Sequence, residues 1–141
     1  MNLKNYASVL YFLLFSVTLY IVHKLVFNFF GTEIQPEQFY HPLEYLYAFF
    51  AGMGILVIVS LIMVFKNAPD FVGMAFLVAT NINLVFSYII ARPILAKTTE
   101  NVQIEKINFF VIFILFLAME IVLTAKMLNN SRKNDQNSKI N

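Results

Sequence analysis

Four long apolar blocks make up most of this 141-residue chain, and they constrain its fold more than any other feature. Each block is long enough to cross a hydrocarbon core of roughly 30 Å, which takes about 20 helical residues. Hydrophobic residues make up 60% of the chain and charged residues only 13%, too few to coat a soluble domain of this size. The sequence therefore predicts an all-α integral membrane protein with four transmembrane helices. The expected spans are about 6–30, 43–65, 71–91 and 107–128.

The connections between the blocks are short and contain helix breakers. Gly31 and Pro36 interrupt the first connection, and Pro69 in "KNAPD" suits the start of the third helix. Pro93 disfavours helical geometry at Arg92, so the third helix is expected to end there. Helices joined so tightly are expected to form an antiparallel up-down bundle.

Segment 129–141 is polar and low in complexity, and it is predicted to be a disordered tail.

The placement of Lys and Arg predicts how the bundle is oriented in the membrane. The side with both termini holds six basic residues and the other side four, so the termini are expected to be cytoplasmic. The two sets are Lys4, Lys66, Lys126, Arg132, Lys133 and Lys139 against Lys24, Arg92, Lys97 and Lys106.

The composition argues against several classes of function. The chain has no cysteine, which rules out disulfides, thiolate chemistry and cysteine-ligated metals. A net charge of +2 gives no reason to expect nucleic acid as a partner. No nucleophile with its base, no His/Glu zinc motif and no paired aspartates can be found in the sequence. We therefore expect no enzyme activity, catalytic residue, metal site or cofactor.

One glutamate, Glu120 in "FLAMEIVL", lies inside the fourth apolar block. It is 13 residues into that block, roughly 20 Å from the outer end at about 1.5 Å per residue. A charge at such depth costs on the order of 2.5 to 3.5 kcal/mol on insertion scales. Glu120 is therefore expected to face the bundle interior, and to accept a hydrogen bond or stay protonated.

The third block supplies polar partners for this glutamate in "ATNINLVFSY". Asn81 is expected to be the donor, because antiparallel helices place it at the depth of Glu120. Thr80, Asn83 and Ser87 follow i, i+3, i+7 spacing and form a polar stripe beside Asn81. Two readings remain open: hydrogen bonds that hold helices together, or a protonatable or cation-binding site. One carboxylate with amides is a poor set of ligands for a metal ion.

A second polar cluster is expected near the outer membrane face. His23 and Lys24 lie near the end of the first block, Glu44 opens the second, and Arg92 follows the third. The cluster is read either as an interfacial ion pair of Lys24 with Glu44, or as a polar vestibule that leads towards Glu120. His23 lacks the i, i+4 partner of a helical metal site.

Small residues in the second and third blocks predict close helix packing. Ala48 and Gly52 are four residues apart, and Gly54 extends the same smooth surface. Ala75 and Ala79 repeat this spacing on the third helix. Such pairs let helix backbones approach closely in membranes.

Three segments in the second half of the chain carry a family resemblance: "APDFVGMAFLVAT", "RPIL" and "NFFVIFILFLAMEIVLTAKMLN". They resemble DUF6168, a family of four-span membrane proteins from Bacteroidetes whose function is not known. The first half is similar only in hydropathy. Members often carry a lysine shortly after "GMAFL", where this chain has Asn81 and Asn83. This departure leaves Glu120 without a cationic neighbour.

The resemblance implies a role, because members accompany genes for F-type ATP synthase. The layout is also similar to the ATP synthase I chain, an accessory protein that assists c-ring assembly. The chain is therefore expected to be a non-catalytic accessory or assembly factor in the bacterial inner membrane. Its partners would be lipid and either ATP synthase membrane subunits or further copies of itself. A small oligomeric ion or proton transporter that uses Glu120, and a purely structural membrane protein, remain alternatives.

Overall fold

The predicted fold class is confirmed, since the chain folds into four helices that are each long and apolar enough to cross a membrane. The computed structural model describes the backbone of residues 3–30, 39–98 and 102–140, and side chains over 6–30, 39–98 and 102–130. The helices are α1 (Leu3–Phe29), α2 (Leu43–Asn67), α3 (Val72–Ala96) and α4 (Val102–Ile140), with a 3-10 turn η2 (Pro69–Phe71) before α3. Within the described residues there is no strand, so the chain is an all-α, multi-pass membrane protein.

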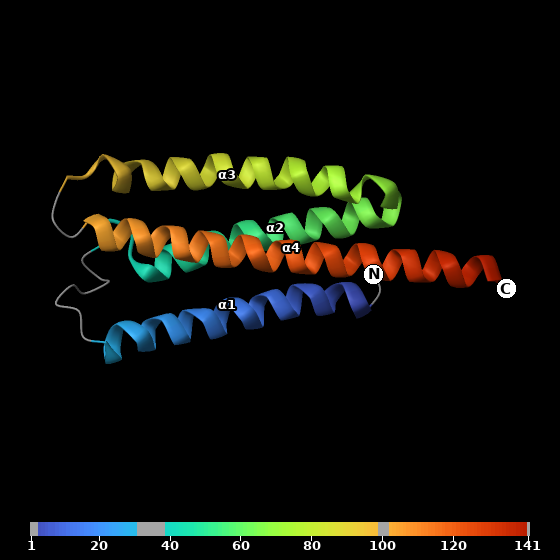
Figure 1. The fold of residues 1–141 in the computed structure, drawn as a ribbon, viewed down its shortest axis with the longest axis horizontal. Helices are drawn as coiled ribbons and strands as arrows, with labels where there is room; N and C mark the ends of the chain where they lie inside the picture. Colours follow the sequence, from blue (N-terminus) through green and yellow to red (C-terminus); the bar gives the residue numbers. More distant parts are fainter. Residues whose placement is uncertain (1–2, 31–38, 99–101, 141) are drawn as a thin grey trace.

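The helices run up and down in the predicted antiparallel order (Figure 1). α2 packs against α1, α3 and α4, whereas α1 makes only a few contacts with α4. α1 and α3 therefore lie on opposite sides of the central pair formed by α2 and α4 (Figure 1). α1 begins on the same side of the bundle as that on which α4 ends (Figure 1).

Aromatic rings fill the core where α1, α2 and α4 meet. Phe12 meets Phe116 edge-on at 5.7 Å between ring centroids, and Phe50 stacks on Phe116 at 5.9 Å. Gly54 makes this arrangement possible, because a Cβ at that position would overlap the Phe12 ring. α1 is thus attached to the central pair by a ring seated against a glycine.

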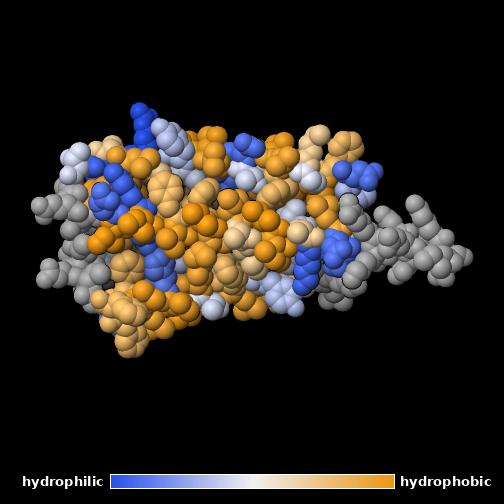
Figure 2. All heavy atoms as spheres, in the orientation of Figure 1, coloured by the Kyte–Doolittle hydropathy of each residue, from blue (hydrophilic) through white to orange (hydrophobic). Residues whose placement is uncertain are grey.

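The outward side chains of α1 and α3 are mostly large and apolar. Figure 2 shows an apolar surface along the bundle, with hydrophilic residues gathered towards both ends. Such a surface would be unusual for a soluble monomer, but it suits the hydrocarbon region of a bilayer.

Two helices, α3 and α4, extend well beyond their predicted spans. α3 continues through Pro93 to Ala96 instead of ending at Arg92. The proline removes only one backbone hydrogen bond near the helix end, and the burial of Ile94 holds the last turn in place. α4 begins at Val102 and continues to Ile140, through the tail expected to be disordered. Neither glycine nor proline occurs after Pro93, so the sequence contains no strong helix stop there.

Candidate functional site

Glu120 on α4 and Asn83 on α3 form a buried polar pair. Glu120 is 1% exposed and Asn83 is 4% exposed. The Asn83 amide donates a hydrogen bond from Nδ2 to Glu120 Oε1 over 3.3 Å. Asn83 lies near the middle of the apolar stretch Pro69–Ala96, so the pair lies deep in the hydrocarbon region. The carboxylate is therefore turned into the bundle, as its position in an apolar run predicts.

The donor to Glu120 is Asn83 and not Asn81, so the expected partner was wrong. Two residues of α-helix rotate the side chain by about 200°, which puts the two asparagines on nearly opposite sides of α3. Asn81 is exposed, and its Nδ2 donates to the backbone oxygen of Leu77 over 2.7 Å. Equal depth in the membrane is therefore not enough for contact, because rotation about the helix axis decides which residue faces α4.

Several polar atoms along this part of the bundle have unused hydrogen-bonding capacity. Thr80 and Ser87 are turned inwards together with Asn83, as the spacing of the stripe predicts. Thr80 Oγ1, Ser87 Oγ, Asn83 Oδ1 and Glu120 Oε2 are all buried and have no hydrogen-bond partner among the described residues. A buried polar atom without a partner costs about 1–3 kcal/mol. We call these four oxygen atoms, three on α3 and one on α4, the seam oxygens.

Neighbouring hydroxyls do not supply the missing donors. Thr124 lies one turn after Glu120, but its hydroxyl donates to the Glu120 backbone oxygen over 2.8 Å. Ser16 on α1 likewise donates to the backbone oxygen of Phe12 over 2.8 Å. Asn83 is therefore the one side-chain donor to the Glu120 carboxylate among the described residues.

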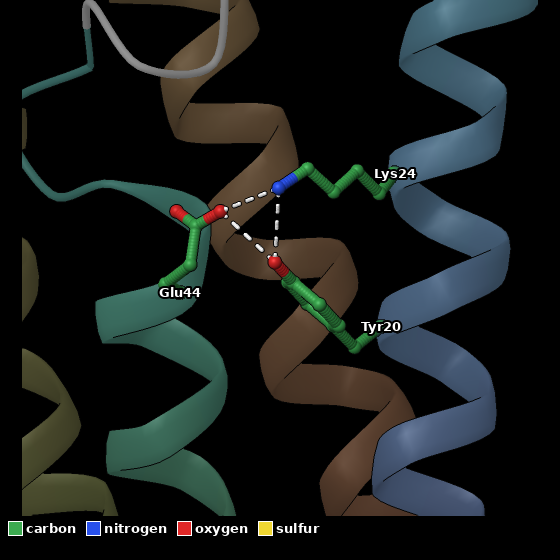
Figure 3. A network of polar contacts seen from close by, with 3 residues as sticks. All are labelled: Tyr20, Lys24 and Glu44. Carbon is green, nitrogen blue, oxygen red and sulfur yellow. Dashed lines mark hydrogen bonds and ion pairs between the residues drawn. The ribbon is translucent and has the colours of Figure 1, made fainter.

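At the end of the bundle away from the N-terminus, Lys24 on α1 and Glu44 on α2 form an ion pair (Figure 3). Lys24 Nζ lies 3.0 Å from Glu44 Oε1, and the Tyr20 hydroxyl donates to the same oxygen over 2.9 Å. Lys24 also donates to Tyr20 Oη over 3.1 Å, which closes a three-membered network. Both charged side chains are about half exposed, so solvent screens the pair and it contributes little to stability.

The other two residues of the predicted outer cluster lie apart from this network. His23 Nδ1 and Tyr47 Oη are 2.9 Å apart, and Tyr47 also donates weakly to the Leu19 backbone oxygen over 3.4 Å. Arg92 is exposed on α3, across the bundle from α1, and forms no ion pair within the described part of the chain. The contacts therefore match an interfacial ion pair on α1 and α2 more closely than a continuous polar vestibule.

Glu105, in the first turn of α4, is a buried carboxylate that was not predicted from the sequence. Glu105 is 3% exposed, and its Oε1 accepts hydrogen bonds from the backbone N–H groups of Tyr40 over 2.6 Å and His41 over 3.3 Å. Its Oε2 lies 3.7 Å from Lys97 Nζ, just after α3. The available signal was an acidic residue in a first helical turn, but residues 92–106 were read as a connection. One carboxylate thus links three segments, the residues before α2, the residue after α3 and the first turn of α4.

The predicted small-residue positions have different surroundings. Gly54 is buried against Phe12, while Ala75 and Ala79 pack with the α2–α3 cluster that contains Leu61. Ala48 and Gly52 instead point outwards, and a Cβ at Gly52 would meet nothing within 4 Å. We call the surface around Ala48 and Gly52 the α2 outer face. It is not used for packing within the described chain.

An apolar groove of about 390 Å³ lies between α3 and α4. Its lining consists of apolar and aromatic side chains together with Ser87. The groove does not include Glu120 or Asn83 in its lining. The buried pair therefore lies outside the lining of this groove.

Within the described residues, no group of three or more His, Asp or Glu side chains could hold a metal ion. Comparisons with protein families, curated proteins and solved structures find no match. The resemblance to DUF6168 therefore stays a prediction.

Proposed function

We propose that this chain is a non-catalytic accessory or assembly subunit of a membrane complex. The observation that carries the proposal is the α2 outer face. Gly52 and Ala48 are exposed four residues apart on a membrane helix, and Gly52 has no neighbouring atoms where a Cβ would be. Small residues make little van der Waals contact with lipid, whereas they allow the backbone of another helix to approach closely. A helix of a partner subunit would therefore bind along α2.

The resemblance to DUF6168 makes F-type ATP synthase the candidate complex. On this proposal the chain resides in the bacterial inner membrane with both termini in the cytoplasm, as the six-to-four distribution of basic residues suggests. The burial of Glu120 also supports a non-catalytic role, because neither the groove lining nor the outer ion pair contains this carboxylate. Glu120 and Asn83 would then stabilise the α3–α4 contact of the subunit.

The test is to capture the tagged protein from native membranes in mild detergent and identify its companions by mass spectrometry. We expect ATP synthase membrane subunits with the wild type, and their loss with Gly52→Leu, which fills the α2 outer face. Gly73→Leu is the matched control, because Gly73 is also an exposed helical glycine with nothing within 4 Å, but it lies on α3. Recovery of the wild-type protein without these subunits would contradict the ATP synthase assignment.

The seam oxygens favour a second candidate function, a small oligomeric proton or cation transporter. Glu120 Oε2 is a titratable oxygen at mid-membrane depth, and three further unpartnered oxygens line the same contact. Intramembrane carboxylates often mark ion pathways. Glu120→Gln in proteoliposomes would abolish flux through such a pathway, whereas Glu44→Gln at the exposed outer pair would leave it intact. Unchanged flux in Glu120→Gln would remove this candidate.

A further inference from the structure

Asn81 places an amide on the outward surface of α3 in the middle of a membrane span. It lies about 18 Å from Pro69 and about 22 Å from Ala96, the ends of that apolar stretch, at about 1.5 Å per residue. Its Nδ2 donates to the Leu77 backbone oxygen, and no described group of the chain donates to its Oδ1. Lipid supplies no donor at this depth, so an outward amide is stabilised when another helix covers it.

The surface around Asn81 has the seven-residue spacing of a helix–helix contact. Met74, Asn81 and Tyr88 are seven residues apart, and all three are exposed. This spacing keeps the same edge of a helix against a parallel partner helix over several turns. The flanking positions are large, apolar and exposed: Leu77, Leu84, Val78 and Val85. We call these seven residues the α3 outer face.

The bundle itself leaves the α3 outer face uncovered. The opposite side of α3 is buried against α2 and α4 through residues that include Asn83, Ser87 and Ala91. α3 also lies along one edge of the bundle, so a further helix could run beside it without displacing another element (Figure 1).

We infer that the α3 outer face binds the same face of a second copy of this chain, with the two Asn81 side chains hydrogen-bonded to each other. An amide carries two N–H donors and a C=O acceptor, so two copies of Asn81 complement each other, whereas an apolar partner would leave Oδ1 and the second N–H of each amide unsatisfied. Copies inserted in one orientation meet about an axis along the membrane normal, which makes the two α3 helices parallel. A single asparagine at a central position of such a contact fixes the register of the two helices.

Disulfide cross-linking tests this contact directly, because the chain has no cysteine of its own. Met74→Cys and Tyr88→Cys should give covalent dimers when native membranes are oxidised. Ile82→Cys is the matched control, since Ile82 is exposed at the same depth but points about 100° away from Asn81. Equal cross-linking at all three positions, or none at Met74 and Tyr88, would overturn the inference.

The role of the amide is tested by exchanging it. Asn81→Leu should weaken dimerisation in liposomes about threefold to thirtyfold, the range expected for an interhelical hydrogen bond in a membrane. Asn81→Gln keeps the donor and acceptor groups and should recover part of the affinity. Energy transfer between labelled copies measures the dimer, and the helical circular dichroism signal shows whether each variant is folded. Wild-type affinity in Asn81→Leu would overturn the pairing of the two amides.

The inference and the proposed function can fail separately, because they use different helices. Gly52→Leu fills the α2 outer face and should leave the Tyr88→Cys cross-link intact. A cross-link from Tyr88→Cys to a different membrane protein would overturn the second-copy assignment. A capture experiment that recovers no ATP synthase subunits would contradict the proposed function but not the contact between two copies through the α3 outer face.

Discussion

The hydrogen bond between Asn83 and Glu120 stabilises the fold by less than its loss would destabilise it, because the loss leaves a buried polar group without a partner. An interhelical hydrogen bond in a membrane contributes only about 0.6 kcal/mol on average. A buried polar group stripped of its partner costs about 1–3 kcal/mol, and Glu120 already has one carboxylate oxygen unpartnered. Removing one partner should therefore destabilise the protein more than replacing both with apolar residues.

Asn83→Leu should lower the free energy of unfolding by about 1–3 kcal/mol, because it removes the donor to Glu120. The double variant Asn83→Leu/Glu120→Met should recover most of that loss, since it removes both members of the pair and leaves neither of them buried without its partner. Unfolding in mixed detergent micelles measures both changes. Asn81→Leu on the outward side of the helix is the control, and on the monomer it should change stability by less than about 0.5 kcal/mol. An equal loss in the control would show that burial of the pair is not the cause.

Gly54 and Gly52 offer a matched comparison of packing on one helix. Gly54→Ala should destabilise the fold by about 1–3 kcal/mol, because its Cβ overlaps the Phe12 ring. Gly52→Ala has open space and should be neutral or slightly stabilising, since alanine is the better helix former. Thermal unfolding of both variants measures the difference. Phe12→Leu should rescue Gly54→Ala, and a failure to rescue would place the strain elsewhere.

At the scale of the helices, hydropathy predicts what crosses the membrane but not which side faces inwards. The four apolar blocks were enough to predict four helices and the depth of Glu120. The outward side of α3 carries many large apolar residues because it faces lipid, so apolar residues alone gave no measure of rotation about the helix axis. Depth alone therefore favoured Asn81 as the partner of Glu120, whereas the packing of α3 against α4 brings Asn83 to it. Thr80, Asn83 and Ser87 were placed together correctly, because three-residue and four-residue spacings keep side chains on one side of a helix.

Glu105 shows a second limit of the sequence. The connection from Arg92 to Lys106 contains charged and polar residues that are typical of a loop, yet α4 already begins at Val102. Glu105 is buried there because backbone N–H groups of Tyr40 and His41, which precede α2, point at its carboxylate. Contacts between the ends of α2, α3 and α4 are not encoded in a local pattern, so the residue could not be found from spacing alone.

Glu105→Ala should loosen the outer end of the bundle without unfolding the helices. Hydrogen bonds to a charged group contribute about 1.5–3 kcal/mol, so amide hydrogen exchange at Tyr40 and His41 should speed up by about tenfold to a hundredfold. Glu105→Gln keeps one acceptor and loses the ion pair with Lys97, and it should give an intermediate rate. Gln103→Ala, an exposed change in the same turn, should leave exchange at Tyr40 unchanged. Equal rates in all variants would contradict the role of Glu105 as a tie between elements.

The whole molecule has its two edge helices on opposite sides of a central pair, and its open surfaces are distributed accordingly. α1 is fastened to the pair by Phe12 and by the outer ion pair, whereas α3 is fastened by the Glu120–Asn83 contact. The α2 outer face and the α3 outer face lie on different helices. A dimer through α3 would therefore leave α2 free for a different partner, which makes the two proposals compatible in one assembly.

Orientation in the membrane is a property of the whole chain. It can be tested with two introduced cysteines, and its basis can be tested by replacing two lysines. Impermeant maleimide added to the outside should label Thr98→Cys, beyond α3, and should reach Asn67→Cys, at the end of α2, only after the membrane is permeabilised. Replacing Lys66 and Lys126 by glutamine reduces the six basic residues on the side of the termini to four, equal to the other side. Because the basic residues bias insertion, the double variant should insert in both orientations, with Asn67→Cys partly labelled from outside. A single, unchanged orientation would show that something other than these lysines determines how the bundle inserts.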